Sequence, residues 1–311
     1  MDQSSTPVTS ALGRVKVRVP AKVNLALKVG ALGDDGYHPL GTVFHALSLY
    51  DDVEARLAEG LSCEMRGDSA DTLPVDGSNL VMRAAALLRE TYDCPQGAEV
   101  SVLKTIPVAG GMAGGSADAA ATLLACAMLW DLDTQPEDLH DLAAQLGSDV
   151  PFALVGGTAR GAGRGTELVP MLSRGTYHWV LALADEGLST PGVYRRFDEM
   201  VAAGEVTPSI EIPPALLNAL AAGDVAGVGR ELVNDLQAPA VSLRPELGDV
   251  LDTGRAAGAL GTVLSGSGPT CAFLVGSEEA AMDLATELSH HRSVWATRRA
   301  VGPVPGARPV S

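Results

Sequence analysis

Apolar residues recur along this chain at two spacings, and each spacing predicts a different kind of element. A period of two indicates a strand with one buried face, whereas recurrence at every third or fourth position indicates an amphipathic helix. Ser78 is a candidate N-cap for the first such helix. In the first half the pattern predicts strands over 15–19, 21–29, 41–57 and 98–106, and helices over 78–92, 116–130 and 136–147.

The second half continues the mixture of strands and helices after a glycine-rich stretch, 156–165, which predicts turns and then a domain boundary near 160–176. Both the first residues, to 13, and the proline-containing tail from Gly302 are predicted to be disordered. The remaining pattern predicts strands over 177–184, 260–264, 271–275 and 293–301, and helices over 191–201, 213–221, 227–236, 245–257 and 277–290. We therefore expect an α+β protein of two domains.

Composition narrows the functional class. The 311 residues, 46% of them hydrophobic, can supply two cores. A formal net charge of −16 argues against non-specific nucleic-acid binding, which needs a basic surface. The four cysteines lie far apart, so neither a zinc site nor a disulfide framework is predicted, and a reduced, cytoplasmic compartment is expected. We also expect no signal peptide and no membrane-spanning segment.

The clearest candidate for chemistry is a glycine-rich loop between a predicted strand and a predicted helix, T-I-P-V-A-G-G-M-A-G-G-S-A-D over 105–118. A loop that leads into a helix start presents free backbone N–H groups and the positive end of the helix dipole, which suit phosphate. It is not a Walker A loop, because Ser116 stands where that motif needs lysine, and it lacks the G-x-G-x-x-G spacing. A simple glycine-rich connector is the alternative explanation.

Four further motifs each have an ordinary structural explanation when seen alone. Lys22 and Asn24 lie two residues apart on a predicted strand, and so on one face, which could be merely solvated. Tyr37 and His38 follow a predicted turn, where they could hold a flat ring or simply lie on the surface. Asp149, in G-S-D-V-P-F, could be a turn or N-cap carboxylate. The segment S-G-S-G-P-T over 265–270 could be a tight hairpin.

Taken together and in this order, the five motifs resemble the GHMP kinases, over about residues 17–275. A-K-V-N-L, D-G-Y-H and G-S-D-V-P-F are similar to one branch, which uses ATP to phosphorylate the 2-hydroxyl of a cytidine diphosphate-linked methylerythritol in the non-mevalonate route to isoprenoid precursors. The resemblance implies an α+β, two-domain GHMP-kinase fold. Residues 14–168 would form an ATP-binding domain like ribosomal protein S5 domain 2, and 169–301 a ferredoxin-like domain.

The resemblance also implies roles for individual residues. Asp149 would be the catalytic base and Lys22 its charge partner, because an opposite charge favours the ionised form. The substrate would contact Asn24 and His38, and its cytosine base would lie between Tyr37 and Tyr194. ATP would lie over a loop made of Pro107, Val108, Ala109, Gly110, Gly111, Met112, Ala113, Gly114, Gly115, Ser116 and Ala117, with Asn79 and Lys104 as further candidates near the nucleotide.

The loop departs from the usual G-L-G-G-G-S-S-N of this branch, since it reads G-M-A-G-G-S-A-D over 111–118. Ala117 lacks a hydroxyl and Asp118 adds a negative charge, which leaves the metal ligands open. Mg²⁺ is nevertheless expected beside the co-substrate ATP, with no nucleic-acid or membrane partner, in a monomer or homodimer. The alternatives are another GHMP kinase of homoserine or mevalonate type, or a non-catalytic nucleotide-binding regulator. The presence of both Lys22 and Asp149 argues against the regulator.

Overall fold

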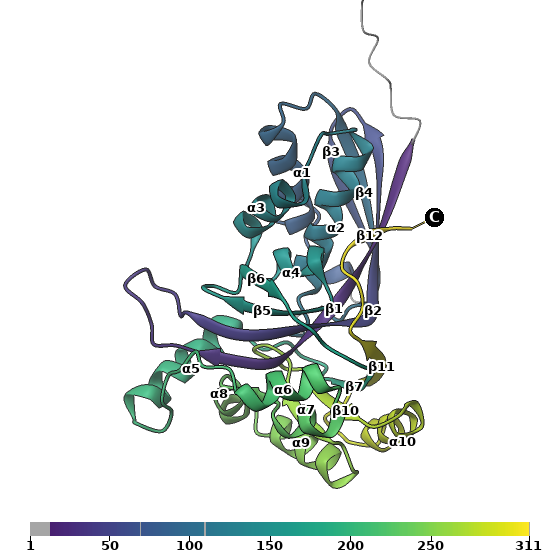
Figure 1. Cartoon of the computed structure of the whole chain (residues 1–311). Helices are drawn as coiled ribbons and strands as arrows, with labels where there is room; N and C mark the ends of the chain where they lie inside the picture. The colour runs from purple at the N-terminus through teal and green to yellow at the C-terminus, as the bar shows by residue number, and fades with distance from the viewer. Residues whose placement is uncertain (1–12, 69, 109, 311) are drawn as a thin grey trace, which may run out of the picture.

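Two β-sheets organise the chain, and the first is built on two very long strands, β1 (Arg14–Val29) and β2 (Leu40–Ala58), which pair antiparallel (Figure 1). The computed structural model describes residues 13–68, 70–108 and 110–310. The main path of the first sheet runs β12-β1-β2-β4-β3, in which β12 is the short strand Arg308–Pro309 near the end of the chain. Its remaining strands in the first half are β3 (Leu61–Gly67), β4 (Gly97–Lys104), β5 (Thr158–Ala162) and β6 (Glu167–Pro170).

Helix α2 (Gly114–Leu129) forms the centre of the first core, where it packs against β1 and β2. Its alanine-rich sequence is buried on nearly every side between Ala117 and Ala127, as expected of a helix with no polar face. Small side chains let neighbouring elements approach it closely. The helices around it are α1 (Leu80–Thr91), α3 (Pro136–Leu146) and α4 (Val150–Val155), and a short 3₁₀ turn, Ala70–Thr72, follows β3.

The second sheet has the order β11-β7-β10-β9, and every adjacent pair in it is antiparallel. Its strands are β7 (Tyr177–Leu183), β9 (Gly261–Leu264), β10 (Cys271–Val275) and β11 (Ala296–Gly302). Its helices are α5 (Thr190–Ala202), α6 (Pro214–Ala222), α7 (Val225–Arg230), α8 (Gln237–Leu243), α9 (Glu246–Ala256) and α10 (Glu278–Ser289). The predicted α+β fold with two domains is therefore confirmed.

Strand β1 connects the two cores. Its residues as far as Ala26 pack in the first core, whereas Leu27 and Val29 pack in the second with Phe273 of β10. The middle of the strand consequently lies where the two halves of the molecule meet. Among the described residues, no helix combines the length and the apolar character that a membrane crossing requires.

Several predicted elements differ from the structure in detail. The predicted helix over 227–236 is wrong, because only Val225–Arg230 is helical and β8 (Val233–Asn234) follows. Strand β8 pairs parallel with β1, and the Asn234 side chain donates to two carbonyl oxygens of a neighbouring hairpin. No predicted element corresponds to β3, α4, β5, β6, β8 or α8. The cap of α1 is Asn79 rather than Ser78, since its Oδ1 accepts from the backbone N–H of Val81 at 2.9 Å.

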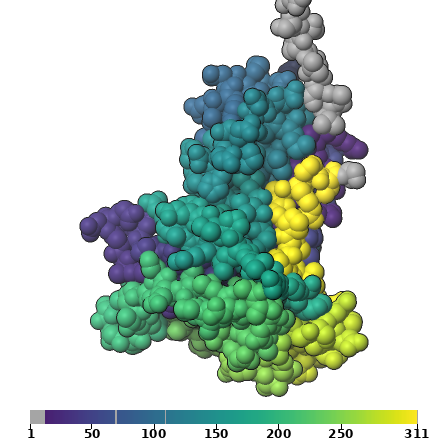
Figure 2. All heavy atoms as spheres, viewed as in Figure 1, coloured from purple at the N-terminus to yellow at the C-terminus, as the bar shows by residue number. Residues whose placement is uncertain are grey.

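The predicted disorder of the tail from Gly302 is also wrong. The tail returns to the first sheet, where β12 (Arg308–Pro309) pairs with β1. Backbone N–H groups of Ala307 and Val310 donate to Ala153 and Lys16. Figure 2 shows this segment in yellow, lying along the first half of the molecule. Its prolines prevented a local prediction, but contacts with residues far away in sequence order it. The predicted disorder at the start of the chain, as far as residue 12, lies outside the described residues.

Candidate functional site

Two adjoining cavities lie where β1, the glycine-rich loop and α5 meet. The first, of about 420 Å³, is lined by the loop together with Lys22, Asn24 and Asp149. The second, of about 740 Å³, is lined by Tyr37, His38 and Tyr194. Both cavities share four lining residues, which are Leu40, Ser148, Thr190 and Tyr194. Two ligands could therefore bind side by side with their ends in contact.

The glycine-rich loop leads directly into α2, as the sequence predicts, although the helix begins earlier, at Gly114. Its N-cap, Ala113, has a left-handed backbone with φ 61° and makes no side-chain capping bond. The first N–H groups of the helix are thus left for a ligand, and the dipole favours an anion there. The loop and helix residues that line the first cavity are Pro107, Val108, Gly110, Gly111, Ala113, Gly114, Gly115, Ser116 and Asp118.

Four of the predicted ATP-binding residues lie elsewhere or are not described. Met112 and Ala117 are buried beneath the loop, each 1% exposed. Asn79 uses its side chain to cap α1 and to donate to the carbonyl oxygen of Pro74. Ala109 lies outside the described residues. For these positions a direct contact with ATP stays a prediction.

Gly111 is the point at which the loop touches the hairpin between β9 and β10. Its backbone φ is +72°, and an added Cβ would overlap the carbonyl oxygen of Ser265. The Ser265 hydroxyl in turn donates to the carbonyl oxygen of Gly111 at 3.0 Å. Glycine is needed here for two reasons, which are the left-handed backbone and the close approach of a second backbone. The S-G-S-G-P-T segment is thus a hairpin, as its structural explanation predicted, and it also supports the loop.

Gly111→Ala should weaken ATP binding about tenfold. Left-handed backbone costs a non-glycine residue roughly 1–2 kcal/mol, so the loop of the variant would relax away from this conformation. Returning to it on binding ATP would cost that free energy, and each 1.4 kcal/mol is about tenfold in affinity. The added methyl group would also push the loop away from the hairpin. Calorimetric titration of the folded variant with ATP measures the change.

Gly258→Ala is the matched control, because Gly258 has φ +92° and no atom within 4 Å of an added Cβ. The control should lose stability but keep its ATP affinity. If Gly111→Ala binds ATP as tightly as the unmodified protein, this loop is not the phosphate site.

Lys22, Asn24 and Asp149 come together at the inner end of the first cavity. Lys22 and Asn24 do share one face of β1, as predicted, and the Lys22 Nζ donates to Asn24 Oδ1 at 2.7 Å. The same ammonium lies 3.7 Å from Asp149 Oδ2. Asn24 also donates to the Thr42 hydroxyl at 2.8 Å, so Thr42 of β2 helps to hold this side chain in place. Lys22 and Asn24 are therefore buried and hydrogen-bonded to each other, and this part of β1 is not a solvated strand face.

Asp149 occupies the N-cap position of α4, but its side chain makes no capping hydrogen bond. A capping aspartate would accept from the helix's first N–H groups. Here the carboxylate instead faces Lys22 and remains 27% exposed toward the first cavity. The ordinary explanation of this aspartate as a cap is therefore excluded, and the carboxylate is available to a ligand.

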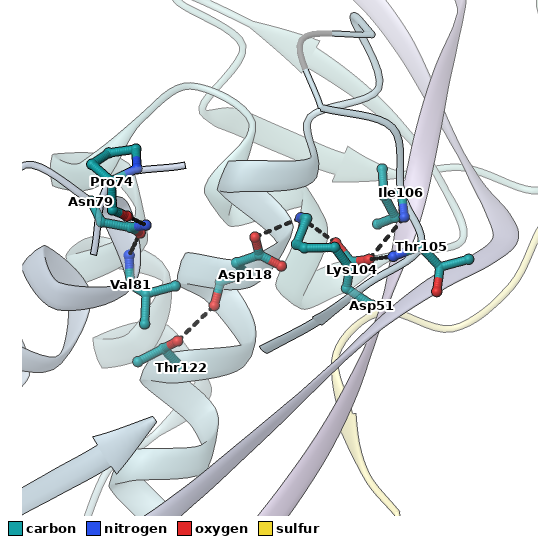
Figure 3. A network of polar contacts seen from close by, with 9 residues as sticks. All are labelled: Asp51, Pro74, Asn79, Val81, Lys104, Thr105, Ile106, Asp118 and Thr122. Atoms are coloured by element: carbon teal, nitrogen blue, oxygen red, sulfur yellow. Dashed lines mark hydrogen bonds and ion pairs between the residues drawn. The ribbon is translucent and has the colours of Figure 1, made fainter. Parts of the chain in front are cut away.

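Lys104 forms a buried charged triad with Asp51 and Asp118 under the glycine-rich loop (Figure 3). Its ammonium donates to Asp51 and, at 2.6 Å, to Asp118 Oδ2. Asp51 also accepts the backbone N–H groups of Thr105 and Ile106, at the point where β4 ends and the loop begins. The triad thus ties the start of the loop to the first turns of α2.

Burial and charge set the ionisation of this triad. Burial by itself lowers the pKa of Lys104, but the charges of Asp118 and Asp51 hold that pKa above its usual value. Burial raises the pKa of Asp118 to about 8 in spite of the nearby ammonium. Although Lys104 lines the first cavity, its ammonium is already held by two carboxyl groups. A direct contact with the nucleotide would have to replace one of these bonds, and it stays a prediction.

The second cavity gathers the aromatic residues that the sequence singled out. Tyr37 lies at its rim, 53% exposed, and His38 lies 5.1 Å from Tyr194 between ring centroids. Burial raises the pKa of Tyr194 to about 12, so its phenol is neutral near pH 7. Tyr37 comes from the β1–β2 connection and Tyr194 from α5. Both residues line the same cavity, and a flat base held between their rings stays a prediction.

Two residues of this cavity, Arg164 and Asp198, were not predicted from the sequence. The Arg164 guanidinium lies 3.5 Å from the centroid of the Tyr37 ring and pairs with Asp35 at 3.1 Å. Asp198 hydrogen-bonds with His38 Nε2 at 2.7 Å. Both partners are more than a hundred residues away in the chain, and no local motif marks either position. The sequence offers one weak signal for Asp198. It follows Tyr194 by four residues, so the two side chains share one face of the predicted helix.

Comparison with known proteins gives two matching family models. One is described as "GHMP kinases N terminal domain" and matches residues 79–157. The other is described as "GHMP kinases C terminal" and matches residues 216–292. Each model falls in one of the two halves that the sheets define.

Whole-length relatives are also found. The chain is 52% identical, over 310 residues, to 4-diphosphocytidyl-2-C-methyl-D-erythritol kinase of Mycolicibacterium smegmatis, covering 99% of this chain and 96% of the relative. It is 54% identical, over 294 residues, to the protein of the same name from Rhodococcus jostii, covering 94% of each. These relatives match the chain nearly from end to end.

Solved structures share the fold. A crystal structure of 4-(cytidine 5'-diphospho)-2C-methyl-D-erythritol kinase matches with a TM-score of 0.74 and 33% identity, covering 92% of this chain and 98% of that one. Homoserine kinase from Cytophaga hutchinsonii matches with a TM-score of 0.76 but 21% identity, covering 97% and 98%. Backbone similarity therefore does not separate these two activities, whereas sequence identity does.

Proposed function

The chain belongs to the GHMP kinase family, and on that premise we propose that it transfers the terminal phosphoryl group of ATP to the 2-hydroxyl of 4-diphosphocytidyl-2-C-methyl-D-erythritol, in the non-mevalonate route to isoprenoid precursors. One observation supports this most directly. A cavity lined by the glycine-rich loop adjoins a second cavity lined by two tyrosines, and the Lys22–Asp149 pair lies in the first cavity, near residues that line both.

The chemistry follows from this arrangement. Phosphoryl transfer depends mainly on positioning and charge stabilisation. Asp149 accepts the proton of the substrate hydroxyl as the new O–P bond forms, since an alcohol does not ionise ahead of that step. The Lys22 ammonium, held at 2.7 Å by Asn24, offsets the negative charge that develops beside it. The backbone N–H groups at the start of α2 hold the phosphates of ATP.

Mg²⁺ accompanies ATP in this proposal, and the residues under the loop fit it. Among the described residues, no group of three or more His, Cys, Asp or Glu side chains could hold a metal. Mg²⁺ beside a nucleotide needs only one or two carboxylates, because phosphates and waters complete its shell. Asp118 Oδ1 is buried without a hydrogen-bond partner, and Ser116 lies in the same turn. Because the pKa of Asp118 is raised to about 8, Mg²⁺ would bind here with release of the carboxyl proton. Asp118 and Ser116 would then hold the ion, which would offset phosphate charge.

An activity panel tests the proposal. ATP consumption is measured with 4-diphosphocytidyl-2-C-methyl-D-erythritol, homoserine and mevalonate as separate acceptors. We expect turnover with the first alone. Turnover with homoserine or mevalonate but not with the cytidine compound would select the runner-up, another GHMP kinase. No turnover with any acceptor, but retained ATP binding, would select the non-catalytic regulator.

Tyr37→Ala and Tyr194→Ala should each raise the KM for the cytidine substrate about tenfold and leave the KM for ATP unchanged. Stacking of an aromatic ring on a base is worth roughly 1–3 kcal/mol. Because both rings are expected to hold the same base, the two losses should couple in a double-mutant cycle. Tyr50→Ala is the control, since Tyr50 lines neither cavity. If both cytidine KM values stay unchanged, the base does not lie between these tyrosines.

A further inference from the structure

His38 is held in one orientation by three contacts from α5. Its Nε2 lies 2.7 Å from Asp198 Oδ1. Its ring packs against Tyr194 at 5.1 Å and meets the edge of Phe197 at 5.8 Å, with ring planes 81° apart. The His38 side chain is only 7% exposed, and Phe197 is fully buried. The imidazole consequently cannot rotate without breaking a hydrogen bond and disturbing a packed core.

The two ring nitrogens of His38 have different surroundings. A carboxylate can only accept a hydrogen bond, so the contact with Asp198 places the proton of the neutral imidazole on Nε2. The other nitrogen, Nδ1, then carries a lone pair and can only accept. Within the described part of the chain, Nδ1 has no hydrogen-bond partner. It is also not fully buried, unlike the Nε2 atom of His45. It is thus an accessible acceptor on a residue that lines the second cavity.

Cytosine and uracil differ in the exocyclic group that would face a hydrogen-bond acceptor such as Nδ1. Cytosine carries an amino group, a donor, where uracil and thymine carry a carbonyl oxygen, an acceptor. A fixed acceptor binds the amino group and leaves the carbonyl oxygen unpaired against another lone pair. Sites with fixed polar groups discriminate strongly in this way, because the wrong partner leaves a buried group unsatisfied.

We propose that Asp198 is a positioning residue for base selection, which fixes the His38 tautomer so that Nδ1 accepts from the cytosine amino group and rejects uracil. This inference rests on the proposed function, since it assumes that a cytidine base occupies the second cavity. It assigns to Asp198, which lies on α5 and outside the catalytic pair, a role in substrate choice.

The test compares Asp198→Asn with the unmodified enzyme on the cytidine diphosphate-linked substrate and on its uridine diphosphate-linked counterpart. Asparagine offers Nε2 either a donor or an acceptor, so the tautomer is no longer fixed. We expect kcat/KM for the cytidine substrate to fall about tenfold, mainly through KM, as for loss of one hydrogen bond. The uridine counterpart should be used equally well or better, and the KM for ATP should not change.

Glu199→Gln is the matched control, because Glu199 is the next residue of α5 and, among the described residues, its carboxylate pairs with Arg196 alone, at 3.1 Å. It should leave the ratio of the two kcat/KM values unchanged. Equal losses on both substrates in Asp198→Asn, or an unchanged ratio, would overturn the proposal while leaving the kinase assignment in place. If the unmodified enzyme uses neither pyrimidine substrate, both this inference and the proposed function fail.

A second measurement does not depend on the variant or on substrate. Nitrogen-15 chemical shifts of the His38 ring in the unmodified protein report which nitrogen carries the proton. We expect the Nε2-protonated tautomer, with a mixture of tautomers in Asp198→Asn. A proton on Nδ1 in the unmodified protein would overturn the proposal even if the variant failed to fold.

Discussion

Asp149→Asn should lower kcat by on the order of 10²- to 10⁴-fold, the usual contribution of a positioned general base. Asparagine keeps the size of the side chain but cannot accept the hydroxyl proton. The phosphate loop is untouched, so the affinity for ATP should change little. The Lys22 ammonium, now 3.7 Å from a neutral group, would keep its hydrogen bond to Asn24.

The measurement is steady-state kinetics at saturating concentrations of both substrates, together with calorimetric titration by ATP. Asp141→Asn is a suitable control, because its side chain is 86% exposed on the neighbouring helix α3. The control should behave like the unmodified enzyme. Near-normal kcat in Asp149→Asn would falsify its assignment as the base, and the proton would then have to leave by another route.

Lys104→Met should destabilise the folded protein by about 3–5 kcal/mol, the usual cost of removing one partner from a buried ion pair. The three side chains of the triad are at most 3% exposed. Methionine fills similar space but leaves the Asp51 carboxylate without its ammonium. Since domains are stabilised by about 5–15 kcal/mol in total, much of the margin would be lost.

Urea unfolding in the absence of nucleotide measures this effect separately from any role in ATP binding. Lys16→Met is the control, because Lys16 is 38% exposed and its partner Asp52 keeps the bidentate contact with Arg18. An exposed pair of this kind contributes about 1 kcal/mol or less. Equal loss of stability in the two variants would show that the triad is not a special element of this core.

The variants of Asp149 and Lys104 are expected to affect two different properties, catalysis and folding stability. Asp149 faces the cavity and makes no structural hydrogen bond, so its removal should affect catalysis without unfolding the protein. Lys104 lies under the loop and ties three elements together, so its removal should affect stability first. Both residues line the first cavity. Burial and hydrogen bonding distinguish them.

Local patterns in the sequence determined most of the elements and the position of the glycine-rich loop at the start of a helix. The pattern over 15–19, 21–29 and 41–57 predicted strands, and the first two are confirmed as one continuous strand, β1, and the third as β2. A run of alanines after glycines predicted a helix that begins at the loop, because both helix propensity and the exposed N–H groups are properties of neighbouring residues. The five motifs in order also identified the family, which the matching models confirm.

Tertiary structure alone decided how the site is held together, because its main contacts join residues far apart in the chain. Lys104 meets Asp51 across 53 residues, and His38 meets Asp198 across 160. The tail from Gly302 looked disordered because its prolines remove donors and interrupt local periodicity. It is ordered nonetheless, because edge groups of β1 and the end of α4 offer it backbone partners. Such partners depend on the path of the whole chain, which no local pattern records.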